Sequence, residues 1–572
     1  MRFLSSTTPS ATSLYSSISC HFSSVPKLPR LPSLPYIPSN YRPRVVQEAQ
    51  KVLTDYLHTT RALPYAYAEH IGTNSIFSLR STISKLRSSA STFSKNFQKF
   101  LRYHPINEFE FFFESIGIHP LEICKFLPAK KFFFSEDSRA LNAACALSDF
   151  GFPWKMLGKL YEEEVSIFCT SPQDLTARLC GFKALGFNSV SVIGICLAFP
   201  CVLSGERELG GEVDTLFDDF KRLFIDFDLT SFVQENVDAW YEVCRKIRVF
   251  YNLGCEKGKT GELMGRSKHI FLNYSEEVLV KKAEFFSRLS VRKGNVGLLL
   301  LEKPEIFIFD LESREISVLC FLKHFGLSVE NLKSVAQNRP YVWGRNKMAN
   351  VPHVMRALGL HEWFFDKIKN GDHNLLADYS ISSLDEDTDK KFIDTLDRIR
   401  SSRTPLHTIG KLNFLHGIGF GENYLTIKVL ENLHGTSCEL QERFDCLLRT
   451  GIEFPKLCRM IFLLPKILSQ KPETLERKVD FLCQEIGVSL KYLDIFPAYL
   501  IFDLENRIKP RYRIHAWLTE KGLCRKQYSP ASLIATSEKQ FIARLYKIHP
   551  AAPKHWLELF LCKNTVAAKK KK

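Results

Sequence analysis

Residues 496–526 read FPAYLIFDLENRIKPRYRIHAWLTEKGLCRK. The stretch predicts an apolar helix that ends near a proline, a short connection and then a second helix. We place Pro510 at the first position of this second helix, where the N–H that proline lacks would have no partner within the helix. We place Gly522 just after its last turn, in the left-handed conformation that glycine adopts at low cost.

The second helix has one apolar face and many cations. Ile514, Trp517 and Leu518 share a face at helical spacing, so we expect them to point into the core and the cations to point toward solvent. Such exposed cations are candidates for binding phosphate groups. The candidate nucleic-acid-binding residues are Arg507, Lys509, Arg511, Arg513, Lys521, Arg525 and Lys526. The competing interpretation is that Arg507 or Arg511 caps the carbonyls at a helix end, or pairs with Glu505.

The same punctuation by glycine and proline recurs upstream. A glycine that ends one helix is followed 14 residues later by a proline in the pairs Gly186/Pro200, Gly326/Pro340 and Gly451/Pro465. Other helices begin at a proline and end at a glycine, as in residues 172–186 and 472–487. Proline before a helix and glycine after it is the order in which these residues favour helix ends.

The spacing between equivalent prolines gives the length of the repeat. Pro304 and Pro340 are 36 residues apart, and Pro465 and Pro497 are 32 residues apart. Two helices in a period of this size are typical of an α-solenoid, in which each repeat buries its apolar surface against its neighbours. We therefore predict an all-α fold, a solenoid of two-helix repeats of about 32–36 residues.

The chain divides by composition and periodicity into six predicted segments. The segments are a transit peptide with a Pro/Ser-rich linker (1–43), an N-terminal helical extension (44–104), a first repeat array (105–370), a diverged or hinge segment (371–412), a C-terminal array with its cap (413–563) and a basic tail (564–572). The repeat is weakest in the segment 371–412, where Ser383 and Glu386 are expected to form a capping box for a helix at about 384–400.

Positive charge is concentrated at the two ends of the chain. The net charge is +16; residues 1–47 hold five cations and no acid, and residues 501–572 have a net charge of +11. Residues 48–500 are therefore neutral overall. A basic end favours a polyanionic partner such as nucleic acid, although a solvated surface with a basic tail has the same composition. The N-terminal 43 residues are rich in serine and contain no acid, which is typical of an organelle transit peptide.

The sequence does not indicate an enzyme, a metal site or a cofactor. The stretch LGCEKGKT at residues 253–260 has three residues between its glycines, whereas a phosphate-binding loop needs four. GIGFG at residues 417–421 lacks the dinucleotide spacing. The 16 cysteines form no C-x-x-C pair and the histidines, among them His353, have no matching ligands. The uncharged residues 184–205 contain glycine, serine and proline and are interpreted as repeat helices, so we expect no membrane span.

The C-terminal motifs resemble the repeats of plant mitochondrial transcription termination factor (mTERF) proteins. The resemblance rests on Leu504-Glu505-x-Arg507-Ile508-x-Pro510-Arg511 and Lys521-Gly522-Leu523, on Ser537-Glu538-Lys539-x-Phe541, and on the run Leu463-Leu464-Pro465-Lys466-Ile467-Leu468. It also rests on Pro472-x-x-Leu475-x-x-Lys478-Val479-x-Phe481-Leu482, which ends at Gly487. Upstream of about residue 440 the resemblance rests on the period and the proline and glycine markers.

The resemblance implies a right-handed, half-doughnut solenoid with a basic groove that holds nucleic acid. It implies a factor for double-stranded DNA that regulates mitochondrial transcription or its termination without catalysis. An RNA-binding factor for intron splicing or ribosomal RNA maturation remains an alternative, as does an α-solenoid scaffold for proteins. The expected partners are double-stranded DNA or structured RNA of the organelle, together with transcription or RNA-processing proteins, and we expect a monomer. We expect a mitochondrial location, with the chloroplast as the alternative.

Overall fold

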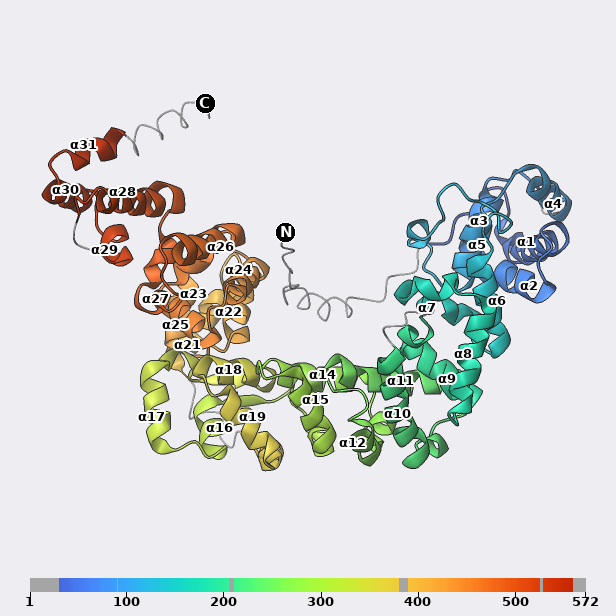
Figure 1. Cartoon of the computed structure of the whole chain (residues 1–572), viewed down its shortest axis with the longest axis horizontal. Helices are drawn as coiled ribbons and strands as arrows, with labels where there is room; N and C mark the ends of the chain where they lie inside the picture. Colours follow the sequence, from blue (N-terminus) through green and yellow to red (C-terminus); the bar gives the residue numbers. More distant parts are fainter. Residues whose placement is uncertain (1–29, 90, 205–209, 380–388, 525–527, 559–572) are drawn as a thin grey trace, which may run out of the picture. The chain divides into compact units, whose positions relative to one another are not determined.

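The computed structural model describes residues 30–89, 91–204, 210–379, 389–524 and 528–558 (Figure 1). The described residues form two compact units, of which unit 1 comprises 30–249 and 256–276, and unit 2 comprises 250–255 and 277–558. Both units are built from short helices, so the prediction of an all-α repeat fold is confirmed. The predicted segment boundaries remain predictions.

Unit 1 begins with the helices of the N-terminal extension and continues into helix pairs. Its helices are α1 (Arg42–Asp55), α2 (Tyr65–Asn74), α3 (Ile76–Ser84), α4 (Phe93–Tyr103), α5 (Glu108–Ser115), α6 (Arg139–Phe150), α7 (Leu157–Glu163), α8 (Pro172–Ala184), α9 (Ser189–Ala198), α10 (Gly210–Lys221), α11 (Val237–Asn252), α12 (Gly261–Arg266) and α13 (His269–Asn273). Aromatic side chains fill much of its core, and Trp240, Phe220 and Phe224 are fully buried.

Unit 2 carries the most regular repeats. Its helices are α14 (Glu276–Ser287), α15 (Lys293–Glu302), α16 (Val318–His324), α17 (Val329–Asn338), α18 (Val351–Leu358), α19 (His361–Lys369), α20 (Leu375–Asp378), α21 (Lys390–Arg400), α22 (Pro405–Gly417), α23 (Tyr424–Glu431), α24 (Ser437–Arg449), α25 (Phe454–Leu463), α26 (Pro472–Asp480), α27 (Tyr492–Ile495), α28 (Lys509–Glu520), α29 (Pro530–Ile534), α30 (Glu538–Ile548) and α31 (Ala552–Trp556).

The glycine and proline markers have the roles that the sequence predicts. Gly186, Gly326 and Gly451 have φ values of +102°, +80° and +96°, which turn the chain out of the first helix of a pair. The second helix then ends two residues before a proline, because proline disfavours helical backbone at the residue that precedes it. Each proline starts a 3-10 turn, as in η6 (Pro200–Leu203) and η14 (Pro465–Ser469).

Two helix starts differ from the prediction. Pro510 is the second residue of α28, and a wider π turn, η17 (Leu504–Ile508), directly precedes this helix. Proline has no N–H with which to close an α turn, so it leaves the carbonyl four residues earlier, in η17, without that partner. The helix expected at about 384–400 begins at Lys390, where the Asp389 carboxylate accepts the N–H groups of Lys391 and Phe392. The proposed capping residues Ser383 and Glu386 lie outside the described residues.

Unit 2 also contains a short strand pair that the sequence does not indicate. β1 (Glu315–Ser317) pairs antiparallel with β2 (Arg345–Lys347), with Ile316 opposite Asn346. Three residues per strand are too few to show alternation. Gly421 packs nearby: its N–H donates to the Tyr341 carbonyl, and a Cβ at this position would lie 2.2 Å from the Trp343 oxygen. Gly419 and Gly421 therefore serve close backbone packing, whereas a Cβ at Gly417 would meet no atom within 4 Å.

A long basic side chain links the two halves of many repeats. It extends from the first helix and donates hydrogen bonds to carbonyls at the end of the second helix or the turn after it, 22 to 27 residues away. We call these side chains the repeat cations. They are Arg178 (to Leu203), Lys246 (to Phe271), Lys282 (to Phe309), Lys411 (to Leu433), Arg443 (to Leu468), Lys478 (to Leu500) and Arg511 (to Leu533).

Arg511 is the most fully engaged of the repeat cations. Its side chain is only 3% exposed and lies 2.6 Å from the carboxylate of Glu538. It also donates to the Leu533, Ile534 and Thr536 carbonyls. Carbonyls at a helix end have no partner within the helix, and leaving such groups buried and unsatisfied is costly. Arg511 therefore joins α28 to the end of α29 and the start of α30.

A membrane span was not expected for residues 184–205. Among the described helices, none alone is long and apolar enough to cross a membrane. Within the described residues, one helix pair, α8 with α9, would be long and apolar enough if taken together, but the chain bends by 116° between the two helices.

Replacing Arg511 by Met should destabilise the α28–α30 region by about 2–4 kcal/mol, because several carbonyls lose a charged donor. Hydrogen exchange of peptides covering residues 504–548 measures this as faster local opening. Arg513→Gln is the matched control, because Arg513 is exposed on the same helix and should change local stability by no more than about 0.5 kcal/mol. Equal protection in both variants would contradict the structural role of Arg511.

His353 should make unit 2 sensitive to acid. Burial, followed by the nearby Arg356 and Arg288, lowers the pKa of His353 from 6.5 to about 3, and its ring stacks on Phe454. Below pH 6.5 the unfolded state gains a proton that the folded state does not. The free energy of unfolding should therefore decrease by about 1–2 kcal/mol as the pH is lowered from 7 to 5. His353→Phe should remove this share of the pH dependence, as measured by hydrogen exchange over α18 and α25. An unchanged pH dependence in the variant would show that His353 titrates normally.

Candidate nucleic-acid interface

The predicted contacts on α28 and η17 occupy very different environments. Arg507 donates to the carbonyls of Ile534 and Thr536, each at 2.9 Å, and to that of Ala535 at 3.3 Å. Its guanidinium also lies over the Phe502 ring, 4.4 Å from the ring centroid. Arg507 therefore caps a helix end, which is the competing role considered from the sequence.

Lys509 and Arg511 are also engaged within the protein. The Lys509 ammonium lies 2.6 Å from Glu505, and its side chain is 24% exposed. The expectation that the cations of this helix point toward solvent is wrong for Arg511, which is buried beside Ile514 and Leu518. The reason is helical periodicity: positions 511, 514 and 518 share one face, and the other residues of that face form the core.

The remaining predicted contacts divide between exposed and undescribed residues. Arg513 and Lys521 are exposed, and within the described parts of the chain neither side chain makes a hydrogen bond or an ion pair. Arg525 and Lys526 lie outside the described residues. The assignment of nucleic-acid contacts to this segment therefore remains a prediction, and Arg513 and Lys521 are the described residues that are free to make them.

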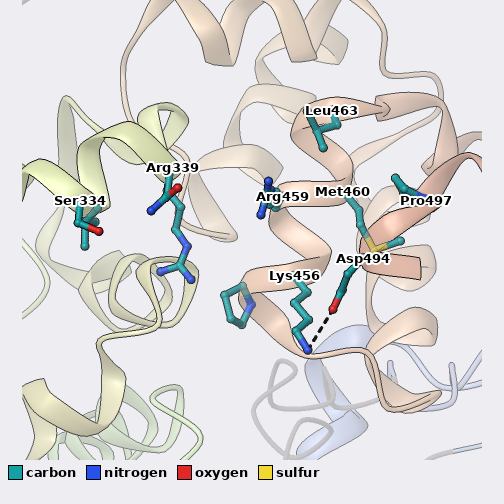
Figure 2. Close-up of a pocket in the computed structure, with 11 residues that line it drawn as sticks. Ser334, Arg339, Lys456, Arg459, Met460, Leu463, Asp494 and Pro497 are labelled. Atoms are coloured by element: carbon teal, nitrogen blue, oxygen red, sulfur yellow. Dashed lines mark ion pairs between the residues drawn. The ribbon is translucent and has the colours of Figure 1, made fainter. Parts of the chain in front are cut away.

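A groove in unit 2 gathers cations that the sequence analysis did not select. It has a volume of about 490 Å³ and lies between α17, α25 and the region of α27. Figure 2 shows Arg339 on one wall, with Lys456 and Arg459 on the other. The lining residues are Ser334, Val335, Asn338, Arg339, Pro455, Lys456, Arg459, Met460, Leu463, Asp494 and Pro497. We call it the basic groove.

Arg339 ends α17 directly before the marker proline Pro340. It is half-buried, and burial lowers the pKa of its guanidinium. Its Nη1 and Nη2 atoms pack against Gly359, where an added Cβ would lie 3.1 Å from Nη1. No carboxylate among the described residues pairs with it. A partly desolvated guanidinium without a counter-ion interacts strongly with an incoming anion.

Lys456 and Arg459 lie on α25 and differ in their pairing. The Lys456 ammonium is 2.8 Å from Glu453 and 3.3 Å from Asp494, and the second contact is drawn in Figure 2. Arg459 is exposed, and no ion pair or hydrogen bond to another described residue occupies it. The groove thus offers two uncompensated guanidiniums, with Ser334 and Asn338 as further hydrogen-bonding groups.

This arrangement suits the phosphate backbone of a nucleic acid. Arginine binds phosphate through two N–H groups at once, and contacts of this kind position a nucleic acid without reading its sequence. The exposed apolar part of the groove, including Leu463 at 53% exposure, can contact a sugar or a base. One feature of the sequence could have pointed to these two arginines: Arg339 and Arg459 belong to the second helices of their repeats, whereas the repeat cations lie on first helices.

The loop that resembles a nucleotide-binding loop is filled by the protein itself. The N–H groups of Gly258 and Gly261 donate to the two carboxylate oxygens of Asp219, at 2.7 and 2.6 Å. Asp219 is buried, so its carboxylate occupies the place that a phosphate would take in a binding loop. In the described part of the chain no His, Cys, Asp and Glu side chains are grouped so that they could hold a metal ion.

Comparison with known proteins identifies the repeats. The mTERF family model matches residues 235–362 and 411–542, which include α17, α25 and α27 and hence the basic groove. The chain is 54% identical over 551 residues to a protein of Arabidopsis thaliana named transcription termination factor MTEF18, mitochondrial, covering 96% of this chain and 98% of that protein. It is also 29% identical over 103 residues to transcription termination factor MTERF15, mitochondrial, of the same plant, covering 18% of this chain and 23% of that protein.

These findings confirm the resemblance inferred from the C-terminal motifs. The full-length relative is named as mitochondrial, so the predicted mitochondrial location is confirmed as well. The family match omits residues 363–410, close to the segment in which the sequence repeat is weakest. The relative, by contrast, extends over nearly the whole chain. On its repeats and its full-length likeness to MTEF18, the chain belongs to the mTERF family.

Proposed function

We propose that this protein binds mitochondrial double-stranded DNA and regulates transcription or its termination, without a chemical step of its own. The family membership and the name of the 54% identical relative support this type of function. The observation that carries the proposal is the basic groove, where the Arg339 and Arg459 guanidiniums face a shared space without a carboxylate partner among the described residues.

Electrostatics favours this use of the groove over a solvated surface. An exposed cation on a helix commonly pairs with an acid one turn away, as Lys281 does with Glu277 at 3.0 Å. Arg339 instead accepts partial burial without such a pair, which costs solvation energy that an anionic ligand would recover. Phosphate is the anion that fits a multi-point basic lining, because successive phosphates of one strand present charge at regular intervals.

The C-terminal cations extend the same function. Arg513 and Lys521 are exposed on α28 and its end, and Arg525 and Lys526 follow in sequence. We propose that these four residues add phosphate contacts to those of the groove. Arg507, Lys509 and Arg511 act indirectly, because they hold the helices that carry the exposed cations.

Replacing both Arg339 and Arg459 by Gln should weaken binding of duplex DNA roughly tenfold or more near 100 mM salt, because two phosphate contacts are lost. The slope of log affinity against log salt concentration should fall by about 2 for the same reason. Titration of the full chain against fluorescent duplexes of mitochondrial sequence at several salt concentrations measures both quantities.

The matched control is Lys281→Gln with Arg400→Gln. Both cations are exposed in unit 2, and each already pairs with an acid. Like the groove variant, this control removes two positive charges from the chain. Equal affinity and slope in the two double variants would refute the groove as the binding site. Absence of binding by the wild-type chain to any nucleic acid at low salt would refute the proposed function. Clear preference for structured RNA over the duplex would assign the protein to splicing or ribosomal RNA maturation instead.

A test in the organelle addresses the biological step. Crosslinking in intact mitochondria, followed by sequencing of the bound nucleic acid, should recover DNA near transcript ends if the protein acts in termination. The Arg339/Arg459 double variant should lose this enrichment while its abundance stays the same. Recovery of intron or ribosomal RNA in place of DNA would contradict the duplex assignment, and absence of any enriched nucleic acid would favour a protein scaffold.

A further inference from the structure

A basic surface lies in unit 1, outside the residues that the family model matches. Residues 70–107 contain six cations and no acid, a segment without negative charge in the otherwise neutral middle of the chain. The matched residues begin only at 235. The segment covers α3, α4 and the serine-rich connection between them.

Helix α4 is divided into two opposite faces. Phe93, Phe97 and Leu101 are almost fully buried and form the inner face. Lys95, Lys99 and Arg102 are exposed on the outer face, at spacings of four and three residues, which align side chains on one side of a helix. We call these three residues the α4 basic face.

The α4 basic face has no internal counter-ions. None of its three cations makes a hydrogen bond, an ion pair or a ring contact within the parts of the chain that the structure describes. Elsewhere in unit 1, exposed cations such as Arg266 and Lys259 pair with a glutamate three or four residues away. Three like charges along one helix repel each other, so the face is disfavoured unless an anion covers it.

The shape of the helix distinguishes between anionic partners. A helix that inserts into a membrane surface presents its apolar face to the lipid, but the apolar face of α4 is used up in the core of unit 1. From Lys95 to Arg102 the helix rises about 10 Å, which spans about three phosphates along one strand of a duplex. Tyr103, 73% exposed at the end of the helix, adds a hydroxyl donor and an aromatic ring.

We propose that the α4 basic face is a second contact surface for the phosphate backbone of nucleic acid, separate from the basic groove. Lys85, which precedes α4 in the same acid-free segment, is exposed as well, whereas Arg87 lies over the Tyr36 ring, 5.5 Å from the ring centroid. The inference rests on the proposed function only in that the chain binds nucleic acid. It assigns part of the affinity to a segment that precedes the matched repeats.

The triple variant Lys95→Gln, Lys99→Gln, Arg102→Gln of the full chain tests the inference. Glutamine has a helix propensity close to that of lysine and arginine, and the substitutions leave the buried face of α4 intact. The circular dichroism spectrum of the variant should therefore match that of the wild-type chain. Duplex affinity near 100 mM salt should drop roughly tenfold or more, and the salt slope should fall by about 2–3. Combined with Arg339→Gln and Arg459→Gln, the loss should exceed that of either set alone.

The control variant is Lys125→Gln, Lys259→Gln, Arg266→Gln, in which three exposed cations of unit 1 that already pair with acids are neutralised. If the α4 variant matches this control in affinity and slope while the wild-type chain binds, the α4 inference is wrong and the proposed function stands. If the wild-type chain binds no nucleic acid, both are wrong. Vesicles containing an anionic phospholipid provide the third arm: loss of vesicle binding with unchanged DNA binding would make the face a membrane contact and overturn the inference.

Discussion

Satisfaction of the carbonyls at helix ends governs how these repeats are built. The second helices are short, many of them end near a proline, and the turn that follows leaves carbonyl oxygens without N–H partners. The repeat cations supply the missing donors from the first helix, across 22 to 27 residues of sequence. One side chain thereby ties the first helix of a repeat to the end of the second. Because the donor is a charged group, each contact is stronger than a neutral hydrogen bond and costly to remove.

This constraint determines which cations remain for function. A basic residue on the inner side of a first helix is needed for the repeat itself, as Lys478 and Arg511 illustrate by being almost wholly buried. Cations on second helices, such as Arg339 and Arg459, point away from these carbonyls and meet in the basic groove. The three cations of α4 are free for a different reason, since they lie opposite the helix face that packs in the core. The number of cations in a segment is therefore a poor guide to phosphate binding.

The anion-binding potential of the backbone is also partly used within the chain. The N–H groups of Gly258, in the loop at 253–260, and of Gly261, directly after it, bind the carboxylate of Asp219, which comes from α10. The sequence shows the glycines and the lysine of that loop but does not show its occupant, because Asp219 is 39 residues away from Gly258. A local pattern that resembles a ligand site can thus be a structural contact once a distant residue of the same chain fills it.

The sequence alone determined the helical repeat, the helix ends at its glycine and proline markers, and the family. Gly186, Gly326 and Gly451 and the prolines that follow act on their own backbone and that of the preceding residue, so their effects can be read locally. The tertiary structure decided which cations are available, because that depends on contacts between residues distant in sequence. Arg511 and Arg513 are two residues apart, but the helix turns them to different sides, one toward the carbonyls of α29 and the other toward solvent. Likewise Arg339 and Arg459 are 120 positions apart and form one groove only because α17 and α25 fold together.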